Sequence, residues 1–203
     1  MTEATDPLYS QDYFEYLHNR SPVRRWIRTF YLKDITQYCI GKCIDFGCGT
    51  GELMKILPDG SIGFEINPVA VAFCRSQGLD VAVYDPELDD YSFNMIPSNT
   101  YSTFTMNHVL EHIEDAHQVI RKIFKNCSRL GVQRIVFTVP GIAGYRSDAT
   151  HRTFIDGKYM EAHDLTTEQE YKLTHSKYFP FNHENVGRFF THNELRFIFD
   201  RRT

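Results

Sequence analysis

The sequence predicts an α/β fold with a doubly wound, mostly parallel sheet. Strand-like segments alternate with amphipathic helical segments over residues 42–140, a pattern that requires crossover connections and places helices on both faces of a sheet. A glycine-rich loop follows the first of these strands. The chain has 203 residues, of which 42% are hydrophobic and 24% charged, and this balance fits one globular domain, residues 1–203.

Residues 1–40 are expected to form an N-terminal helical cap. A short helix is predicted over residues 10–20, with Tyr13 among its apolar members. A second helix begins at Ser21, a good N-cap, followed by Pro22 at the first helical position. Its apolar residues recur at helical spacing, and Gly41 is expected to end it.

Residues 42–140 are expected to form the core. The predicted strands cover residues 42–46, 61–66, 80–84, 102–106 and 134–139. The predicted helices between them cover residues 52–57, 68–77 and 114–130. Asn67-Pro68 is a typical helix start, and Gly131 is a typical helix end.

Residues 141–203 change in character. Residues 142–170 are polar and rich in histidine, which suits a lid or acceptor loop. Residues 171–181 and 195–201 are expected to pair as a closing antiparallel hairpin.

The most informative stretch is the glycine loop at residues 45–51, which reads Asp-Phe-Gly-Cys-Gly-Thr-Gly. Glycine lets the chain turn tightly and lets a ligand approach the backbone, and a ligand across this turn is expected to meet free backbone N–H groups. Glu65 lies 18 residues after Gly47, at the end of the second predicted strand. In doubly wound sheets an acidic residue at this place accepts hydrogen bonds from ribose hydroxyls.

Dinucleotide dehydrogenases share this arrangement but carry the fingerprint G-x-G-x-x-G. Here Glu52 stands where the third glycine would be, and its carboxylate would repel a pyrophosphate. A ligand that contains adenosine but no phosphate fits these residues better.

These motifs resemble those of the class I S-adenosylmethionine-dependent methyltransferases. Residues 45–51 resemble their motif I, Glu65 their ribose-binding acid, and Asp85 the residue they place near the adenine amino group. Residues 107–113 resemble their N-x-L-E-H-I segment. The resemblance implies a Rossmann-like sheet of seven strands and S-adenosyl-L-methionine as the cofactor.

The resemblance also implies a cofactor-binding set of residues. Gly47 and Gly49 would face the methionine part, Asp45 would support the loop, and Asn107 would lie near the amino-acid end. Tyr13 is expected to lie near the sulfonium, whose charge aromatic faces stabilise. The full predicted set is Asp45, Gly47, Cys48, Gly49, Glu65, Ile66, Asp85, Asn107 and Tyr13.

A second resemblance concerns residues 13–21 and 140–154. Both are similar to segments of bacterial methyltransferases that are often associated with surface-polysaccharide genes. The resemblance implies a small molecule or a sugar as the methyl acceptor, with oxygen as the methylated atom. The alternative function is a catalytically silent S-adenosylmethionine-binding module that regulates a partner.

A hydroxyl acceptor needs a base of near-neutral pKa, and histidine suits that role. We expect His151 to be this base, oriented by Asp148 three residues earlier, with His112 as the second candidate.

Residues 108–112 also match H-x-x-E-H, the inverted zinc-protease motif. Because the segment lies at a strand exit and the methyltransferase motif accounts for it, we expect no metal.

Charge and hydropathy bear on whether the protein binds nucleic acid and whether it lies in a membrane or is secreted. The net charge of −4 gives no general attraction to nucleic acid, and the Asn/Asp-Pro-Pro-aromatic motif of DNA and RNA amino methyltransferases is missing after residue 106. No segment has the roughly 18 consecutive apolar residues of a membrane span, and the N-terminus lacks a signal-peptide core. We therefore expect a cytoplasmic protein with reduced cysteines, and nothing in the sequence indicates the oligomeric state.

Overall fold

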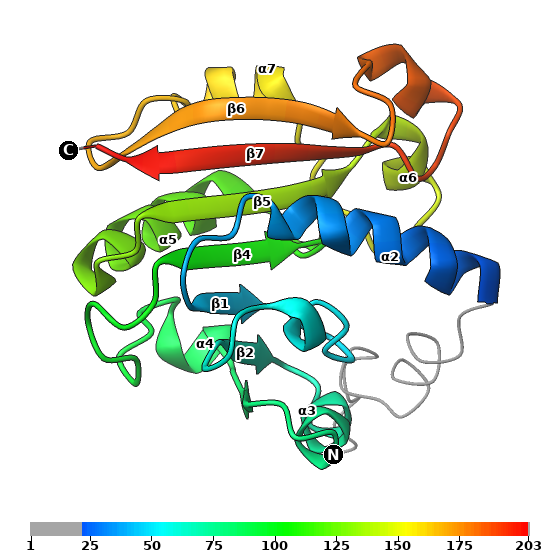
Figure 1. Ribbon diagram of the computed structural model, residues 1–203. Coiled ribbons are helices and arrows are strands. Elements are labelled where there is room, and N and C mark those ends of the chain that lie inside the picture. The colour runs from blue at the N-terminus through cyan, green and yellow to red at the C-terminus, as the bar shows by residue number, and fades with distance from the viewer. Residues whose placement is uncertain (1–21, 203) are drawn as a thin grey trace, which may run out of the picture.

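The computed structural model describes residues 22–202, and the prediction for residues 10–20, including Tyr13, lies outside this range. A seven-stranded sheet forms the centre of the molecule, with the strand order β3-β2-β1-β4-β5-β7-β6 (Figure 1). The strands are β1 (Cys43–Phe46), β2 (Ile62–Glu65), β3 (Val81–Val83), β4 (Thr103–Asn107), β5 (Arg134–Pro140), β6 (Tyr171–Phe179) and β7 (Glu194–Arg201). The first five are parallel, while β7 pairs antiparallel with both β5 and β6. The predicted fold class is confirmed.

Helices cover both faces of this sheet, with α2 in front of it and α5 behind it in Figure 1. The α-helices are α2 (Pro22–Thr36), α3 (Pro68–Ser76), α4 (Pro86–Asp89), α5 (Ala116–Leu130), α6 (Ile142–Arg146) and α7 (Gly157–Ala162). Short 3₁₀ helices form at η2 (Met54–Ile56), η3 (Leu110–His112) and η4 (Glu184–Arg188). Successive side chains of β1 point to opposite faces of the sheet. Cys43 packs in the apolar cluster on one face, and Ile44 packs in the apolar cluster on the other.

Local signals explain the helix ends. The Asn67 side chain accepts hydrogen bonds from the backbone N–H groups of Val69 (2.9 Å) and Ala70 (3.2 Å), as an N-cap should. α5 ends at Gly131, whose φ of +81° is the left-handed conformation expected of a glycine C-cap. None of the helices within residues 22–202 is long and apolar enough to cross a membrane.

Three local expectations differ from the structure. The helix predicted over residues 52–57 is only a 3₁₀ turn, because Pro58 forces the preceding Leu57 into extended backbone. The second helix ends at Thr36 rather than at Gly41. The third strand ends at Val83, so that Asp85 lies beyond the strand, as the N-cap of α4.

A buried ion pair fixes α2 to the C-terminal hairpin. The Arg196 side chain on β7 is fully buried and pairs with Asp34 on α2. Its guanidinium also lies 4.9 Å from the centroid of the Phe179 ring on β6. Burial lowers the pKa of Arg196 to about 10, so the group is still charged at neutral pH and needs its partner.

Replacement of Asp34 should therefore be costly. We expect Asp34→Ala to lower the free energy of unfolding by about 3 kcal/mol, because a buried guanidinium loses its partner. The double variant Asp34→Ala/Arg196→Met should recover most of this loss. Urea denaturation measures both, with the exposed Asp59→Ala as the control, and equal stabilities for Asp34→Ala and the control would contradict the prediction.

Candidate functional site

The glycine loop follows β1 and is hydrogen-bonded to the end of the neighbouring strand β2. Gly47 has a φ of +73°, and a Cβ atom there would lie 2.3 Å from Cγ2 of Val109, so no other residue fits without a shift. The backbone N–H groups of Gly47 and Cys48 both donate to the carbonyl oxygen of Phe64, at 2.8 and 3.1 Å. The loop is therefore a preformed turn held against β2.

The Glu65 carboxylate holds the same loop from the side. Oε2 accepts a hydrogen bond from the N–H of Gly49 (2.7 Å), and Oε1 accepts one from the N–H of Asn67 (3.0 Å). Burial raises the pKa of Glu65, and these backbone donors oppose the rise. The expectation of free N–H groups at this turn is wrong for Gly47, Cys48 and Gly49, since each donates within the protein. Each carboxylate oxygen of Glu65 can accept a further hydrogen bond, so a ligand hydroxyl can still bind there.

Asp45 and Asn107 lie at the carboxyl ends of the neighbouring strands β1 and β4. Asp45 is 2% exposed and accepts a hydrogen bond from the Thr105 hydroxyl (2.8 Å). Burial raises the pKa of Asp45 to about 6, and Thr105, Arg28 and Asn107 oppose this rise.

Asn107 lies close enough to Asp45 to lower the pKa of that carboxyl, but its amide has no partner at full hydrogen-bond geometry within residues 22–202. Both its side-chain N and O are buried, and neither makes a hydrogen bond with residues 22–202. Because buried polar atoms are nearly always paired, this amide indicates an external polar group such as the amino-acid end of a cofactor. The residues at this edge of the sheet thus fit the predicted cofactor.

The other predicted cofactor residues have different surroundings. The Cys48 side chain packs in the apolar cluster with Cys74, and hydrogen bonding to that thiol, with burial, raises the pKa of Cys48 far above its ordinary value. Cys48 can therefore serve a ligand through its backbone only. Ile66 is half-buried directly after β2. One Asp85 oxygen accepts from the N–H of Glu87 (2.9 Å), so this carboxylate also has a structural use.

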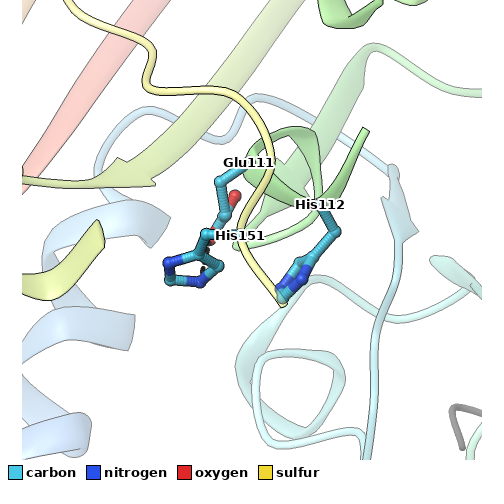
Figure 2. Close-up of side chains that lie close together, drawn as sticks. All are labelled: Glu111, His112 and His151. Carbon is cyan, nitrogen blue, oxygen red and sulfur yellow. Dashed lines mark ion pairs between the residues drawn. The ribbon is translucent and has the colours of Figure 1, made fainter. Parts of the chain in front are cut away.

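A second polar group forms where the segment after α6 docks on η3. Glu111, His112 and His151 lie together, with their ligating atoms within 4.8 Å of one another (Figure 2). The backbone brings them there, because the N–H groups of Arg152 and Thr153 both donate to the carbonyl oxygen of Glu111, at 2.7 and 3.1 Å. The structure thus brings the two predicted histidines together, with 4.8 Å between their ring centroids.

Hydrogen bonds define the orientation of both rings. Nδ1 of His151 lies 2.8 Å from the carbonyl oxygen of Tyr145, which can only accept, so Nδ1 carries a proton. The Thr150 hydroxyl donates to Oδ1 of Asp148 (2.7 Å) and therefore accepts from Nδ1 of His112 (3.1 Å). In the neutral form of each ring, the lone pair is then on Nε2. Burial lowers the pKa of His112 and favours this neutral form.

Asp148 does not orient His151 as the sequence suggested. Its Oδ2 lies 4.0 Å from Nε2 of His151, which is too far for a hydrogen bond. Asp148 instead accepts from both the N–H (2.9 Å) and the hydroxyl of Thr150, and these bonds outweigh the effect of burial and lower its pKa. Asp148 thus acts on His112 through Thr150, while the Tyr145 carbonyl orients His151.

His108 contacts this group through Glu111. Its Nδ1 is 3.2 Å from Oε1 of Glu111, and its Nε2 is 3.0 Å from Oε1 of Glu194 on β7. Burial opposes protonation of the ring, but the two carboxylates outweigh it and raise the pKa of His108. The ring is therefore a cation between two carboxylates, and Oε1 of Glu111 is nearer to His108 (3.2 Å) than to Nε2 of His151 (4.0 Å). The helix that the H-x-x-E-H protease motif requires is replaced by the short η3.

A cavity of about 490 Å³ is lined by other residues of this part of the chain, and neither His112 nor His151 is among them. Its walls are Ile142, Arg146, Phe154, Asp156, Tyr178, Glu184, Arg188 and Phe189, from α6, the segment after it, β6 and η4. The Tyr145 ring links the cavity to His151, because it stacks on His151 (5.5 Å between centroids) and contacts Phe154 in the wall (5.3 Å). The cavity is thus one aromatic ring away from His151.

The sheet order and the polar edge at β1, β2 and β4 define a Rossmann-like nucleoside-binding protein. A family model described as a methyltransferase domain matches residues 16–202. The chain belongs to this family and is an S-adenosylmethionine-dependent methyltransferase. A comparison with curated proteins finds no matching sequence.

Solved structures share the fold at low sequence identity. The N-methyltransferase NodS from Bradyrhizobium japonicum WM9, in complex with S-adenosyl-L-homocysteine, has a TM-score of 0.64 and 15% identity, covering 98% of this chain and 100% of its own. The magnesium protoporphyrin IX methyltransferase ChlM from Synechocystis PCC 6803 has a TM-score of 0.63 and 13% identity, covering 96% of each chain. The small RNA methyltransferase HEN1 has a TM-score of 0.62 and 16% identity, covering 100% of this chain and 27% of its own. These proteins differ in their named substrates, so the fold alone does not identify the acceptor.

Sequence reasoning missed four residues of the acceptor side. Glu111 stood in the N-x-L-E-H-I motif but received no role, although its sequence neighbour His112 did. Thr150 lies between two predicted residues, which was a usable signal. Tyr145 contacts His151 through its backbone carbonyl, and Glu194 contacts His108 from the distant strand β7. No local sequence pattern marks either residue.

The raised pKa of Asp45 predicts a pH-dependent stability. A carboxyl whose pKa is higher in the folded than in the unfolded state stabilises the fold while it is protonated, below about pH 4, and this contribution is lost as the pH rises through about 6. For the ligand-free protein, we expect the stability of wild type relative to Asp45→Asn to fall by up to about 3 kcal/mol between pH 4 and pH 7. Urea denaturation at several pH values measures the difference, and parallel pH curves for the two proteins would contradict it.

Proposed function

We propose that this methyltransferase transfers a methyl group to a hydroxyl oxygen of a small molecule or sugar. The observation that carries the proposal is the pair of imidazoles, His112 and His151, which lie in one group with Glu111 and, in their neutral forms, each have a lone pair on Nε2. A hydroxyl must lose its proton during methylation, and an unprotonated imidazole accepts it.

The cofactor would bind at the carboxyl edge of β1, β2 and β4. The Glu65 carboxylate would accept hydrogen bonds from ribose hydroxyls, and the Asn107 amide would hold the amino-acid end. The backbone at Gly47 and Gly49 would lie against the methionine part, and Asp85 near the adenine. The bound cofactor supplies a sulfonium methyl that is already electrophilic. The chain therefore has to orient the acceptor oxygen and exclude water.

The cavity supports a small, polar acceptor. Its volume of about 490 Å³ lies within the usual range of roughly 300–1,000 Å³ for small-molecule sites. Its walls combine aromatic rings with arginine and carboxylate groups, which suit the apolar faces and the hydroxyl groups of a sugar. A nucleic-acid acceptor is disfavoured by the net charge of −4, which gives no general attraction to phosphates.

Incubation with labelled donor tests the acceptor class. The purified protein is supplied with S-adenosylmethionine carrying a labelled methyl group and with fractions of an extract from cells that express it. We expect label in the small-molecule fraction, in a product that resists alkaline hydrolysis as an O-methyl ether does. Label in RNA or protein would overturn the proposed acceptor class. Donor binding without any labelled product would favour the regulatory module.

The Glu65 assignment predicts a loss of donor affinity. We expect Glu65→Ala to weaken binding of S-adenosylmethionine by about 1–3 kcal/mol, because charged hydrogen bonds to the ribose are lost. Isothermal titration calorimetry measures this, with the exposed Glu161→Ala as the control. Because Glu65 also holds the glycine loop, Glu65→Gln serves as the milder variant and thermal unfolding checks its fold. An unchanged dissociation constant in both variants would show that Glu65 does not bind the ribose.

The base assignment predicts a loss of rate without a loss of donor binding. We expect His151→Asn to lower kcat by about 10²–10⁴-fold, the usual contribution of a general base, while the dissociation constant of the donor stays the same. The exposed His175 on β6 provides the control, since His175→Ala should keep full activity. Activity of His151→Asn within twofold of wild type would rule out this role.

A further inference from the structure

Glu111, His112 and His151 are residue types that can bind a metal ion as well as transfer protons. We propose that these three side chains form a binding site for one divalent first-row transition-metal cation. Each offers one ligand atom, and these atoms lie within 4.8 Å of one another. Figure 2 shows the two rings and the carboxylate directed toward a common space at the junction of η3 and the segment after α6.

The ligand types select the kind of cation. Two imidazole nitrogens and one carboxylate oxygen are a common ligand set for Zn²⁺ and for divalent iron, cobalt and manganese. Mg²⁺ and Ca²⁺ prefer sites made of oxygen atoms, so they fit this group less well. Three protein ligands leave at least one coordination position open for water or for another oxygen.

The surrounding hydrogen bonds support this arrangement. Metal-binding histidines usually donate their other ring N–H to a carbonyl or carboxylate, which fixes the ring and directs the remaining nitrogen to the metal. His151 donates in this way to the carbonyl of Tyr145 (2.8 Å). His112 is held by Thr150, whose hydroxyl donates to Asp148 (2.7 Å). Both Nε2 atoms are therefore presented as ligands.

An independent observation comes from the Glu111 carboxylate. The side chain is 1% exposed, and Oε1 accepts from His108, but Oε2 has no hydrogen-bond partner within residues 22–202. A buried carboxylate oxygen without a partner is costly, and such atoms are rare in folded proteins. A cation that binds Oε2 together with the two imidazoles would remove this cost.

The geometry requires a small adjustment on binding. Metal bonds of about 2.1 Å separate tetrahedral ligand atoms by about 3.4 Å, so the present span of up to 4.8 Å must shorten by up to about 1.4 Å. Nε2 of His151 now lies 4.0 Å from Oε1 of Glu111 and 4.0 Å from Oδ2 of Asp148. Movement of the segment around His151 toward η3 would close the site, and Asp148 is near enough to become a further ligand.

A bound cation would also affect methyl transfer. A metal ion lowers the pKa of an oxygen that it binds, so an acceptor hydroxyl would lose its proton more easily beside it. Cation binding itself depends on neither the donor nor the acceptor. The site is therefore tested separately from the proposed function.

The experiment uses tag-free protein, stripped with chelator and titrated with Zn²⁺, Mn²⁺ and Co²⁺ in separate calorimetric runs. We expect at least one of these ions to bind with a stoichiometry near one and to raise the unfolding temperature. His112→Ala, His151→Ala and Glu111→Gln should each weaken binding by about 10–100-fold. His175→Ala is the matched control for surface histidines and should bind as wild type does.

The results that would overturn the site are equally specific. Absence of one-to-one binding for all three ions would exclude it, and so would binding that persists in the His112, His151 and Glu111 variants or is lost equally in His175→Ala. If a variant fails to fold, the visible absorption of Co²⁺ in wild type still reports whether the ion has nitrogen and oxygen ligands in a low coordination number. A spectrum of fully hydrated Co²⁺ would also exclude the site.

Discussion

The parallel pairing of β1 with both β2 and β4 is the constraint on which the cofactor end of the molecule depends. Asp45 lies opposite Gly63 on one side and Thr105 on the other, so the three strands end at the same edge of the sheet. This register brings Glu65 and Asn107, on the two outer strands of the three, to either side of the glycine loop. Because β1 is inside the sheet, its end is held from both sides, and the loop after it is fixed before any ligand binds.

The acceptor side depends on a different and more local contact. Two backbone N–H groups of the segment after α6 donate to the carbonyl of Glu111, and this docking brings His151 against η3. The contact joins residues about 40 positions apart in the sequence. A rigid sheet edge thus carries the cofactor residues, whereas a docked segment carries the acceptor residues. A segment held by a few hydrogen bonds can move more easily than a sheet, and the inferred closure around a cation uses this property.

The sequence predicted the sheet and the cofactor edge because their signals are local. Alternating periodicity, Asn67 before Pro68 and Gly131 after a helix each determine structure within a few residues, and the alternation of strands with helices predicts a mostly parallel sheet. The contacts on the acceptor side are not local. Asp148 is close to His151 in sequence, yet a carbonyl six residues away orients the ring. The prediction of free N–H groups in the glycine loop was wrong for the same reason. The Phe64 carbonyl and the Glu65 carboxylate, which accept hydrogen bonds from these N–H groups, belong to another strand.

The two roles inferred for His151 exclude each other at any one moment. The Nε2 atom has a single lone pair, which either accepts a proton from a hydroxyl or binds a cation. In the cation-free protein, His151 would be the base, and the proton would remain on the ring until the solvent removes it. In the cation-loaded protein, the ring would be a ligand, and the acceptor hydroxyl, with its pKa lowered by the cation, would release its proton to solvent water. The buried Oε2 atom of Glu111 favours the second case, because proton transfer at His151 leaves it without a partner whereas a cation provides one.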